Sequence, residues 1–202
     1  KENRVFIQQK DIQRSFVKVG IGAEKKSKVV SEKEKRITAY HEAGHAILFH
    51  VLPDVGPVYT VSIIPTGGGA AGYTMPLPEK DEMFNTRGKM LQEITVSLGG
   101  RVAEELILDD ITTGASQDIK QATAMAKSMV MKFGMSEELG LINYDNDNEE
   151  VFVGRDFGHT SRGYGEEVAG KIDKEVKKII DDCYREAKHI IKEHEGVLEA
   201  CA

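Results

Sequence analysis

Two histidines and a glutamate at fixed spacing form the most reactive pattern in the sequence. The segment His41-Glu42-Ala43-Gly44-His45 matches the pattern H-E-x-x-H. On a helix, residues four positions apart lie on one face, so both imidazoles can reach the same metal ion. Glu42 lies three residues before His45, where its carboxylate can take a proton from water at that metal. This spacing is typical of zinc proteases.

The segment around this pattern has the signals of a well-defined helix. Ser31 and Glu34 form a capping box, which predicts a helix start, and Pro53 predicts an end after Leu52. Gly44 lowers helix stability in mid-helix, and such a glycine usually has a packing or functional reason. Both observations disfavour the alternative in which the two histidines merely decorate an amphipathic helix.

A catalytic zinc ion needs a third protein ligand and an open position for water. Three downstream acids, Glu104, Glu105 and Asp118, are candidates for that ligand. Glu104 and Glu105 could instead be solvated carboxylates on a helix surface, and Asp118 could simply complement a helix dipole. Local sequence patterns leave this choice open.

The remaining pattern predicts a mainly α fold with a small β-hairpin or sheet element, whose long helices surround the metal as a single core. The expected helices cover 10–19, 86–108, 116–133 and 166 to about 195, and the hairpin joins 58–64 to 72–75. Gly99-Gly100 is a weak point that suggests close approach of another element. Ser116 is the expected N-cap of its helix and Gly134 its stop. Residues 143–165 are expected to be a mobile connection, and the end of the chain suggests a truncated further helix.

Composition limits the classes of protein to consider. The chain has 202 residues, 40% hydrophobic and 30% charged, which fits one main domain. A formal net charge of −6, with Lys and Arg spread along the chain, argues against nucleic acid as a partner. Cys183 and Cys201 fit neither a disulfide framework nor a cysteine zinc site, so we expect a reducing compartment. No apolar run approaches the roughly 20 residues that span a bilayer, and the first residue is not Met, which suggests a piece of a longer protein.

Four segments at compatible separations, running in order from about Val30 to the end, are more specific than the zinc pattern alone. They are Thr38-Ala39-Tyr40-His41-Glu42-Ala43-Gly44-His45-Ala46, Gly99-Gly100-Arg101-Val102-Ala103-Glu104-Glu105, Thr112-Thr113-Gly114-Ala115-Ser116-Gln117-Asp118 and Gly134-Met135-Ser136. Together they closely resemble the FtsH family of membrane-anchored ATP-dependent metalloproteases.

The resemblance implies two regions in this chain. Residues 1–29 would be the tail of an ATPase module and a linker, and residues 30–202 a helical zinc-metalloprotease domain. The phosphate-binding loop and transmembrane helices of the family would lie upstream, so ATP would act only through that module. Residues 64–73 depart from the commoner family pattern, because they lack an Arg after the proline and have a more glycine-rich turn. The departure concerns the substrate-facing hairpin and leaves the metal chemistry unchanged.

The resemblance also implies roles for individual residues. Asp118 would be the third ligand of one Zn²⁺ per chain, beside His41 and His45, with Glu42 as general base. Glu104 would be a partner of a ligand histidine or a helix-packing residue. The other histidines, His50, His159, His189 and His194, receive no role.

By resemblance, the expected function is hydrolysis of peptide bonds in unfolded or membrane protein substrates. The family implies a homo-hexameric ring, a place in protein quality control, and a cell-membrane location with this domain on the cytoplasmic side. An extended peptide could add as a strand to the hairpin edge. One alternative is a non-catalytic ring-assembly module with a vestigial metal site, which the intact His41, Glu42, His45 and Asp118 argue against. Another is a zinc hydrolase of non-protein substrates, which the lack of an evident small-molecule motif weakly disfavours.

Overall fold

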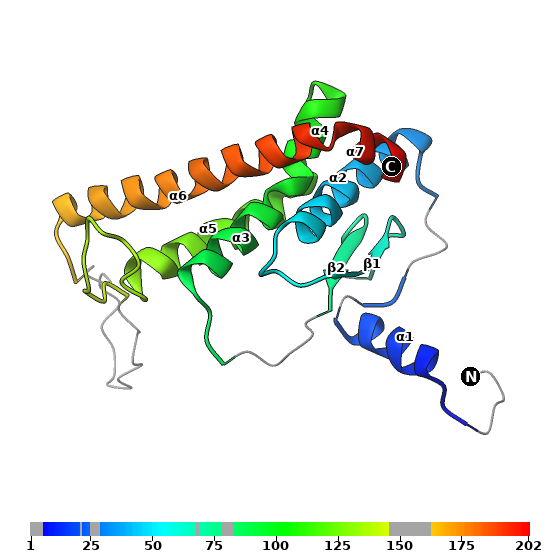
Figure 1. Ribbon diagram of the computed structural model, residues 1–202, viewed down its shortest axis with the longest axis horizontal. Helices are drawn as coiled ribbons and strands as arrows, with labels where there is room; N and C mark the ends of the chain where they lie inside the picture. The colour runs from blue at the N-terminus through cyan, green and yellow to red at the C-terminus, as the bar shows by residue number, and fades with distance from the viewer. Residues whose placement is uncertain (1–5, 21, 25–28, 68, 78–82, 146–162) are drawn as a thin grey trace, which may run out of the picture.

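The structure is a computed structural model that describes residues 6–20, 22–24, 29–67, 69–77, 83–145 and 163–202. Its elements are α1 (Gln9–Gly20), α2 (Glu32–Val51), β1 (Val58–Ser62), β2 (Tyr73–Pro76), α3 (Arg87–Ser97), α4 (Gly99–Leu108), the 3-10 turn η1 (Thr113–Ala115), α5 (Ser116–Met131), α6 (Glu166–Glu193) and α7 (Glu195–Cys201) (Figure 1). Within the described residues the only sheet has two strands. The predicted mainly α fold with a small β element is confirmed.

Helix α2 begins and ends where the sequence predicts. The Ser31 hydroxyl accepts from the backbone N–H of Glu34 at 3.2 Å, and the Glu34 carboxylate accepts from the Ser31 N–H at 3.3 Å. The helix ends at Val51, and the backbone of Leu52 is extended before Pro53. Both boundaries depend on neighbouring residues in the chain, which explains why the sequence predicts them.

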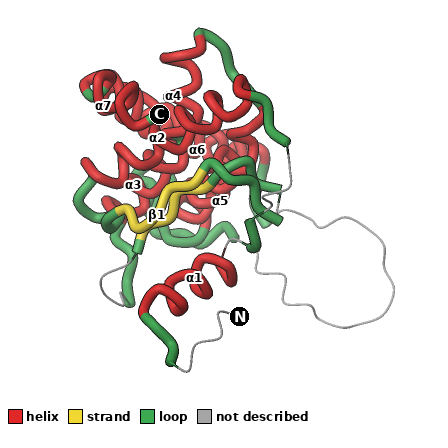
Figure 2. Tube along the Cα trace, turned by 90° about the vertical axis from the view of Figure 1, so that its right-hand side faces the viewer, coloured by secondary structure: helices red, strands yellow, loops and turns green. Residues whose placement is uncertain are grey.

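The predicted hairpin forms beside α2. β1 and β2 are antiparallel, with Val61 opposite Thr74 and Ser62 opposite Tyr73. Figure 2 shows the hairpin on the outside of the helices, with α1 set apart beyond it. Both strands contact α2, so the hairpin forms one wall beside the H-E-x-x-H segment.

The helices enclose two clusters of buried side chains. One lies between α3, α5 and α6 and includes Ile94, Met129 and Ile179. The other lies between α2, α4, α6 and α7 and includes Leu48 and Ile191. Helix α6 contributes to both clusters and runs along α3 and α5 in Figure 1. The expected single core is therefore divided in two, and α6 fixes α2 relative to α5.

The prediction of one helix over 86–108 is wrong. The chain forms α3 and α4 with a break at Leu98, whose φ and ψ are −85° and −8°. Two consecutive glycines follow the break, and because glycine is a poor helix former, the helix is interrupted at this point. The break lets α4 follow a new direction, in which it packs closely on α2.

The contact between α4 and α2 requires glycine on both helices. A Cβ on Gly44 would lie 2.5 Å from the carbonyl oxygen of Gly99, and one on Gly100 would lie 2.4 Å from the His41 ring. Any larger residue would force the backbones apart. The predicted close approach of another element at these glycines is confirmed.

The prediction of Ser116 as an N-cap is wrong. Helix α5 begins at Ser116 itself, directly after the turn η1. The capping contact lies earlier, where the Thr112 hydroxyl accepts from the N–H of Gly114 at 3.0 Å. The helix ends at Met131, slightly before the predicted end, and Gly134 follows with a φ of +62°.

The last predicted long helix is confirmed as α6, which ends at Glu193, close to the predicted end. The short helix α7 begins at Glu195, where the sequence suggests a further helix. The expected mobile connection falls mainly on 146–162, outside the described residues, and His159 lies there too. No helix among the described residues has the length and apolarity that crossing a membrane would require. The boundary predicted at residue 30 stays a prediction.

Candidate metal centre

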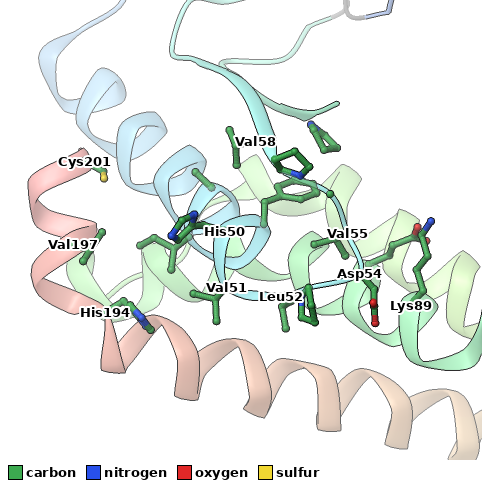
Figure 3. Close-up of a pocket in the computed structure, with 18 residues that line it drawn as sticks. His50, Val51, Leu52, Asp54, Val55, Val58, Lys89, His194, Val197 and Cys201 are labelled. Atoms are coloured by element: carbon green, nitrogen blue, oxygen red, sulfur yellow. The ribbon is translucent and has the colours of Figure 1, made fainter. Parts of the chain in front are cut away.

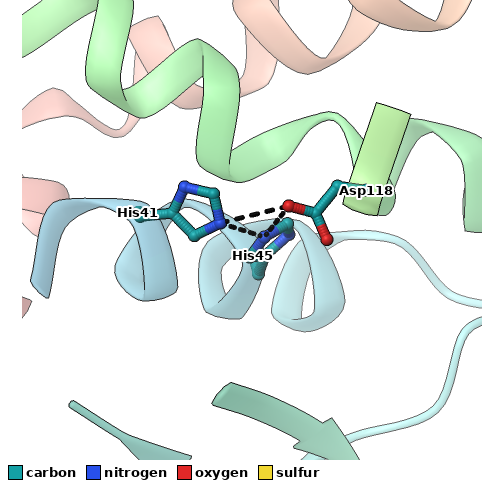
Figure 4. A group of neighbouring side chains, drawn as sticks. All are labelled: His41, His45 and Asp118. Atoms are coloured by element: carbon teal, nitrogen blue, oxygen red, sulfur yellow. Dashed lines mark hydrogen bonds and ion pairs between the residues drawn. The ribbon is translucent and has the colours of Figure 1, made fainter. Parts of the chain in front are cut away.

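Two helices bring His41, His45 and Asp118 together. The histidines lie one turn apart on α2, and Asp118 lies in the first turn of α5. The two Nε2 atoms are 3.1 Å apart, and Asp118 Oδ2 lies 3.3 Å from Nε2 of His41 and 3.9 Å from that of His45. All three side chains point toward one place (Figure 4). Among the described residues, no other group of three His, Cys, Asp or Glu side chains is arranged to hold a metal ion.

The other ring nitrogen of each histidine already has an acceptor. Nδ1 of His41 lies 2.8 Å from Glu104 Oε1, and Nδ1 of His45 lies 2.7 Å from the carbonyl oxygen of Val96. Each Nδ1 therefore carries a hydrogen, which leaves Nε2 of each ring as the atom that can bind a metal ion or a further proton. Two lone pairs at 3.1 Å repel unless a cation or proton lies between them, so the arrangement favours a bound metal ion.

The donor atoms have the spacing of a tetrahedral zinc site. Zinc–nitrogen bonds of 2.0–2.1 Å at tetrahedral angles place neighbouring ligand atoms about 3.3 Å apart. The separations of 3.1 and 3.3 Å are close to this value, and the third, 3.9 Å between His45 and Asp118, is wider. Three protein ligands leave the fourth position open, as in catalytic zinc sites. The donor set thus fits zinc.

The protein side chains alone give the two histidines opposite pKa shifts. Burial by itself lowers the pKa of His41, but hydrogen bonds with Asp118 and Glu104 outweigh burial and raise it to about 9. Burial, reinforced by the charge of His41, lowers the pKa of His45 to about 4. Burial opposes ionisation of Asp118, but its hydrogen bond with His41 outweighs this and lowers its pKa. Without a metal ion, His41 therefore holds a proton that its hydrogen bond with Asp118 stabilises, where a metal ion would otherwise bind.

The structure separates the three candidate acids. Asp118 alone joins the histidine Nε2 atoms. Glu104 lies behind His41, is 1% exposed, and also accepts from the backbone N–H of Thr112 at 2.9 Å. Glu105 forms an ion pair with Lys188 on α6 at 2.8 Å. Sequence alone could not rank these residues, because their distances depend on how α4 and α5 pack on α2.

Glu42 lies beside the metal site against strand β2. Its side chain is 6% exposed, and burial raises the pKa of its carboxyl group, partly offset by a hydrogen bond from Thr74. The Thr74 hydroxyl lies 2.7 Å from Glu42 Oε2 and 3.1 Å from the Glu42 carbonyl oxygen. Sequence analysis missed Thr74, because nothing in the sequence shows which face of β2 meets α2.

Comparison with known proteins decides the family. Residues 28–202 match peptidase family M41. The chain belongs to this family. The predictions of a protease and of the FtsH family are thereby confirmed.

Named relatives share most of this M41 chain. A Caldicellulosiruptor bescii protein named ATP-dependent zinc metalloprotease FtsH is 50% identical over 188 residues, which are 93% of this chain and 30% of the relative. A Thermotoga maritima protein of the same name is 47% identical over 199 residues, 98% of this chain and 32% of the relative. The chain therefore spans about a third of the length of these relatives.

The group of His41, His45 and Asp118 opens into a large cleft. The cleft has a volume of about 1170 Å³ and is bordered by α2, β2, η1 and α5. This is slightly above the roughly 300–1,000 Å³ of pockets for small ligands, so the cleft has room for a ligand larger than most small molecules. Strand β2 borders the cleft, and within the part of the chain that the structure describes it pairs only with β1. Among those residues, no strand lies beside its second edge.

A second cavity of about 1110 Å³ lies at the far end of α2, between the 52–58 loop and α7 (Figure 3). His50, His194 and Cys201 line it, but these side chains do not gather as metal ligands. Both cysteines are free thiols, with Cys183 buried and Cys201 exposed. The second cavity therefore adds no metal chemistry to the M41 site.

Proposed function

We propose that this chain is the zinc-dependent endopeptidase module of a longer ATP-dependent protease, with His41, His45 and Asp118 as the zinc ligands. One observation carries the proposal. Two imidazole Nε2 atoms and a carboxylate oxygen converge at tetrahedral spacing, while both Nδ1 atoms are already bonded elsewhere. The names of the relatives, which state zinc and proteolysis, support the same assignment.

The proposed reaction divides the chemistry between the metal and Glu42. A zinc ion held by these ligands supplies Lewis acidity toward the scissile carbonyl and toward the attacking water. Glu42 takes the proton of that water and later passes it to the leaving amine. The raised pKa of Glu42 suits this exchange, because a general base is most efficient when its pKa lies nearer the working pH. Glu104 keeps the His41 ring oriented through Nδ1.

The open edge of β2 is the proposed place for the substrate. An extended peptide that pairs with β2 would lie in the cleft beside Glu42 and the ligand group. Backbone pairing accepts many sequences, which suits unfolded or membrane protein substrates. Residues 64–73, which depart from the commoner family pattern, lie directly before and at the start of this strand and would modify peptide binding there.

The properties of the whole protein follow by analogy with its named relatives. We propose an upstream ATPase that delivers substrate, with residues 1–29 as its tail and linker and 30–202 as the protease domain. A homo-hexameric ring, a membrane anchor in a missing segment, a cytoplasmic position of this domain and a role in protein quality control belong to the same proposal. ATP would act only through the upstream module.

Zinc content and hydrolysis of an unstructured protein test the assignment. Purified wild type, Glu42→Gln, Asp118→Ala and Glu105→Gln would be compared by elemental analysis and by casein hydrolysis, with and without a chelator. Glu105→Gln is the matched control, because Glu105 lies on α4 next to Glu104 and pairs with Lys188 away from the site.

The expected pattern separates metal binding from proton transfer. Glu42→Gln retains zinc and loses hydrolysis, Asp118→Ala loses both, and Glu105→Gln behaves as the wild type. Zinc retained in Asp118→Ala would remove Asp118 from the ligand set. A wild type that binds zinc without hydrolysing casein would instead favour an assembly module.

A further inference from the structure

The Glu42 carboxylate is held between two residues of the hairpin. A Cβ on Gly72 would lie 2.6 Å from the Ser62 carbonyl oxygen, 2.7 Å from Thr38 Cγ2 and 2.9 Å from Glu42 Oε1, so the backbone at Gly72 lies close to the Glu42 carboxylate. Two residues along the chain, the Thr74 hydroxyl lies 2.7 Å from Oε2. Alternate residues of a strand point to the same face, so Gly72 and Thr74 together face α2.

The Thr74 hydroxyl contacts Glu42 in two places. Besides Oε2, it lies 3.1 Å from the main-chain carbonyl oxygen of Glu42. A hydroxyl has one hydrogen and two lone pairs, so it donates to one of these acceptors at a time. The shorter distance and the charge of the carboxylate favour donation to Oε2. Among the described residues, no donor contacts Oε1, which is therefore left for water.

We infer that Thr74 is a positioning residue for hydrolysis, whose hydroxyl fixes the Glu42 carboxylate in the orientation that receives the proton of the attacking water. The inference rests on the proposed role of Glu42 as general base. Without the hydroxyl, the carboxylate keeps its negative charge in a buried place but loses its one hydrogen bond from a side chain, and it turns toward solvent or toward His41.

The contact suits both stages of the proposed proton exchange. While Glu42 is a carboxylate, Thr74 donates to Oε2. Once Glu42 has accepted a proton on Oε1, Oε2 becomes the carbonyl oxygen of the acid and still accepts from the same hydroxyl. The side chain is thus held in one place before and after it takes the proton.

Thr74 also links the general base to the substrate strand. It lies in β2, whose open edge is the proposed site of peptide pairing. A peptide bound there would pair in a fixed register with β2, the same strand whose Thr74 contacts Glu42. The distance between scissile bond and base is then set by one rigid element, which favours a productive geometry.

Three substitutions test this role. Thr74→Val removes the hydroxyl but keeps the size and β-branching, whereas Thr74→Ser keeps the hydroxyl. Thr60→Val is the matched control, because Thr60 lies in the same hairpin opposite Met75. Each variant would be measured for zinc content, for kcat and KM on a fluorogenic peptide, and for the Glu42 conformation in a crystal structure of the metal-free protein.

We expect Thr74→Val to retain zinc and to keep KM within about twofold, while kcat falls about 10- to 100-fold, part of the roughly 10²–10⁴-fold that a positioned base contributes. Thr74→Ser should recover most of kcat, and Thr60→Val should match the wild type. The metal-free Thr74→Val crystal should show the Glu42 carboxylate turned away from β2.

Wild-type kcat in Thr74→Val, or Thr74→Ser as impaired as Thr74→Val, would overturn the inference. So would loss of zinc in Thr74→Val, because the hydroxyl would then support the fold of the site. The proposed function fails separately, by hydrolysis that survives Glu42→Gln.

Discussion

Gly100→Ala should damage the metal site while leaving the fold intact. The new methyl carbon would lie 2.4, 2.5 and 2.6 Å from Cε1, Nε2 and Nδ1 of His41. Favourable contact between carbon atoms needs about 3.5–4.0 Å, so the ring or helix α4 must move by about 1 Å. The ring is also bonded through Nδ1 to Glu104 of the same helix at 2.8 Å, which leaves it little freedom.

The substitution should weaken zinc binding more than it lowers the stability of the zinc-free protein. Overpacking a core typically lowers the unfolding free energy by about 1–3 kcal/mol. Replacing glycine by alanine inside a helix raises it by about 1 kcal/mol. The net change in unfolding free energy of the zinc-free protein should therefore be about 0–2 kcal/mol. Metal–ligand distances tolerate only about 0.2 Å, so a 1 Å shift of His41 should weaken zinc binding by at least about 100-fold, or about 2.7 kcal/mol.

Competition with a chromophoric chelator would measure zinc affinity, and denaturant unfolding would measure stability. Gly170→Ala is the control, because no atom lies within 4 Å of its Cβ, and it should change neither stability nor zinc affinity. Wild-type zinc affinity in Gly100→Ala would refute the reasoning.

Two further outcomes follow from the contacts behind the ligands. Glu104→Gln should weaken zinc binding about 10- to 100-fold by loosening His41, whereas Glu105→Gln should not, and equal affinities in the same competition assay would remove Glu104 from the site. Because the pKa of His41 is raised to about 9, the zinc-free protein carries this proton at pH 7 and zinc must displace it. Zinc affinity should therefore rise by up to about tenfold per pH unit from pH 7 to about pH 9 and then level off, with about one proton released per ion. Calorimetry in buffers of different ionisation enthalpy measures that release, and binding without proton release would contradict the pKa shift.

Local chemistry explains how much of the fold was predictable. The capping box of Ser31 and Glu34 and the block at Pro53 act within a few residues, so α2 could be placed from the sequence. The sequence marks Gly99-Gly100 as a weak point, but the change of direction at Leu98 also depends on how closely α4 packs on α2, which local sequence does not show. The error at Ser116 has a local cause, since the turn η1 precedes α5 and has its own cap at Thr112.

The residues of the candidate site also fall into two groups, those that local sequence places and those that only packing brings together. The sequence by itself determined that His41 and His45 share one face of a helix with Glu42 beside them, because helical periodicity fixes neighbours four residues apart. Only the tertiary structure decided which of three acids meets the histidines, and only it brought Thr74 to Glu42. These contacts span 73 to 77 residues for Asp118, 63 for Glu104 and 32 for Thr74, and their distances are set by packing of helices and strands that local sequence does not encode.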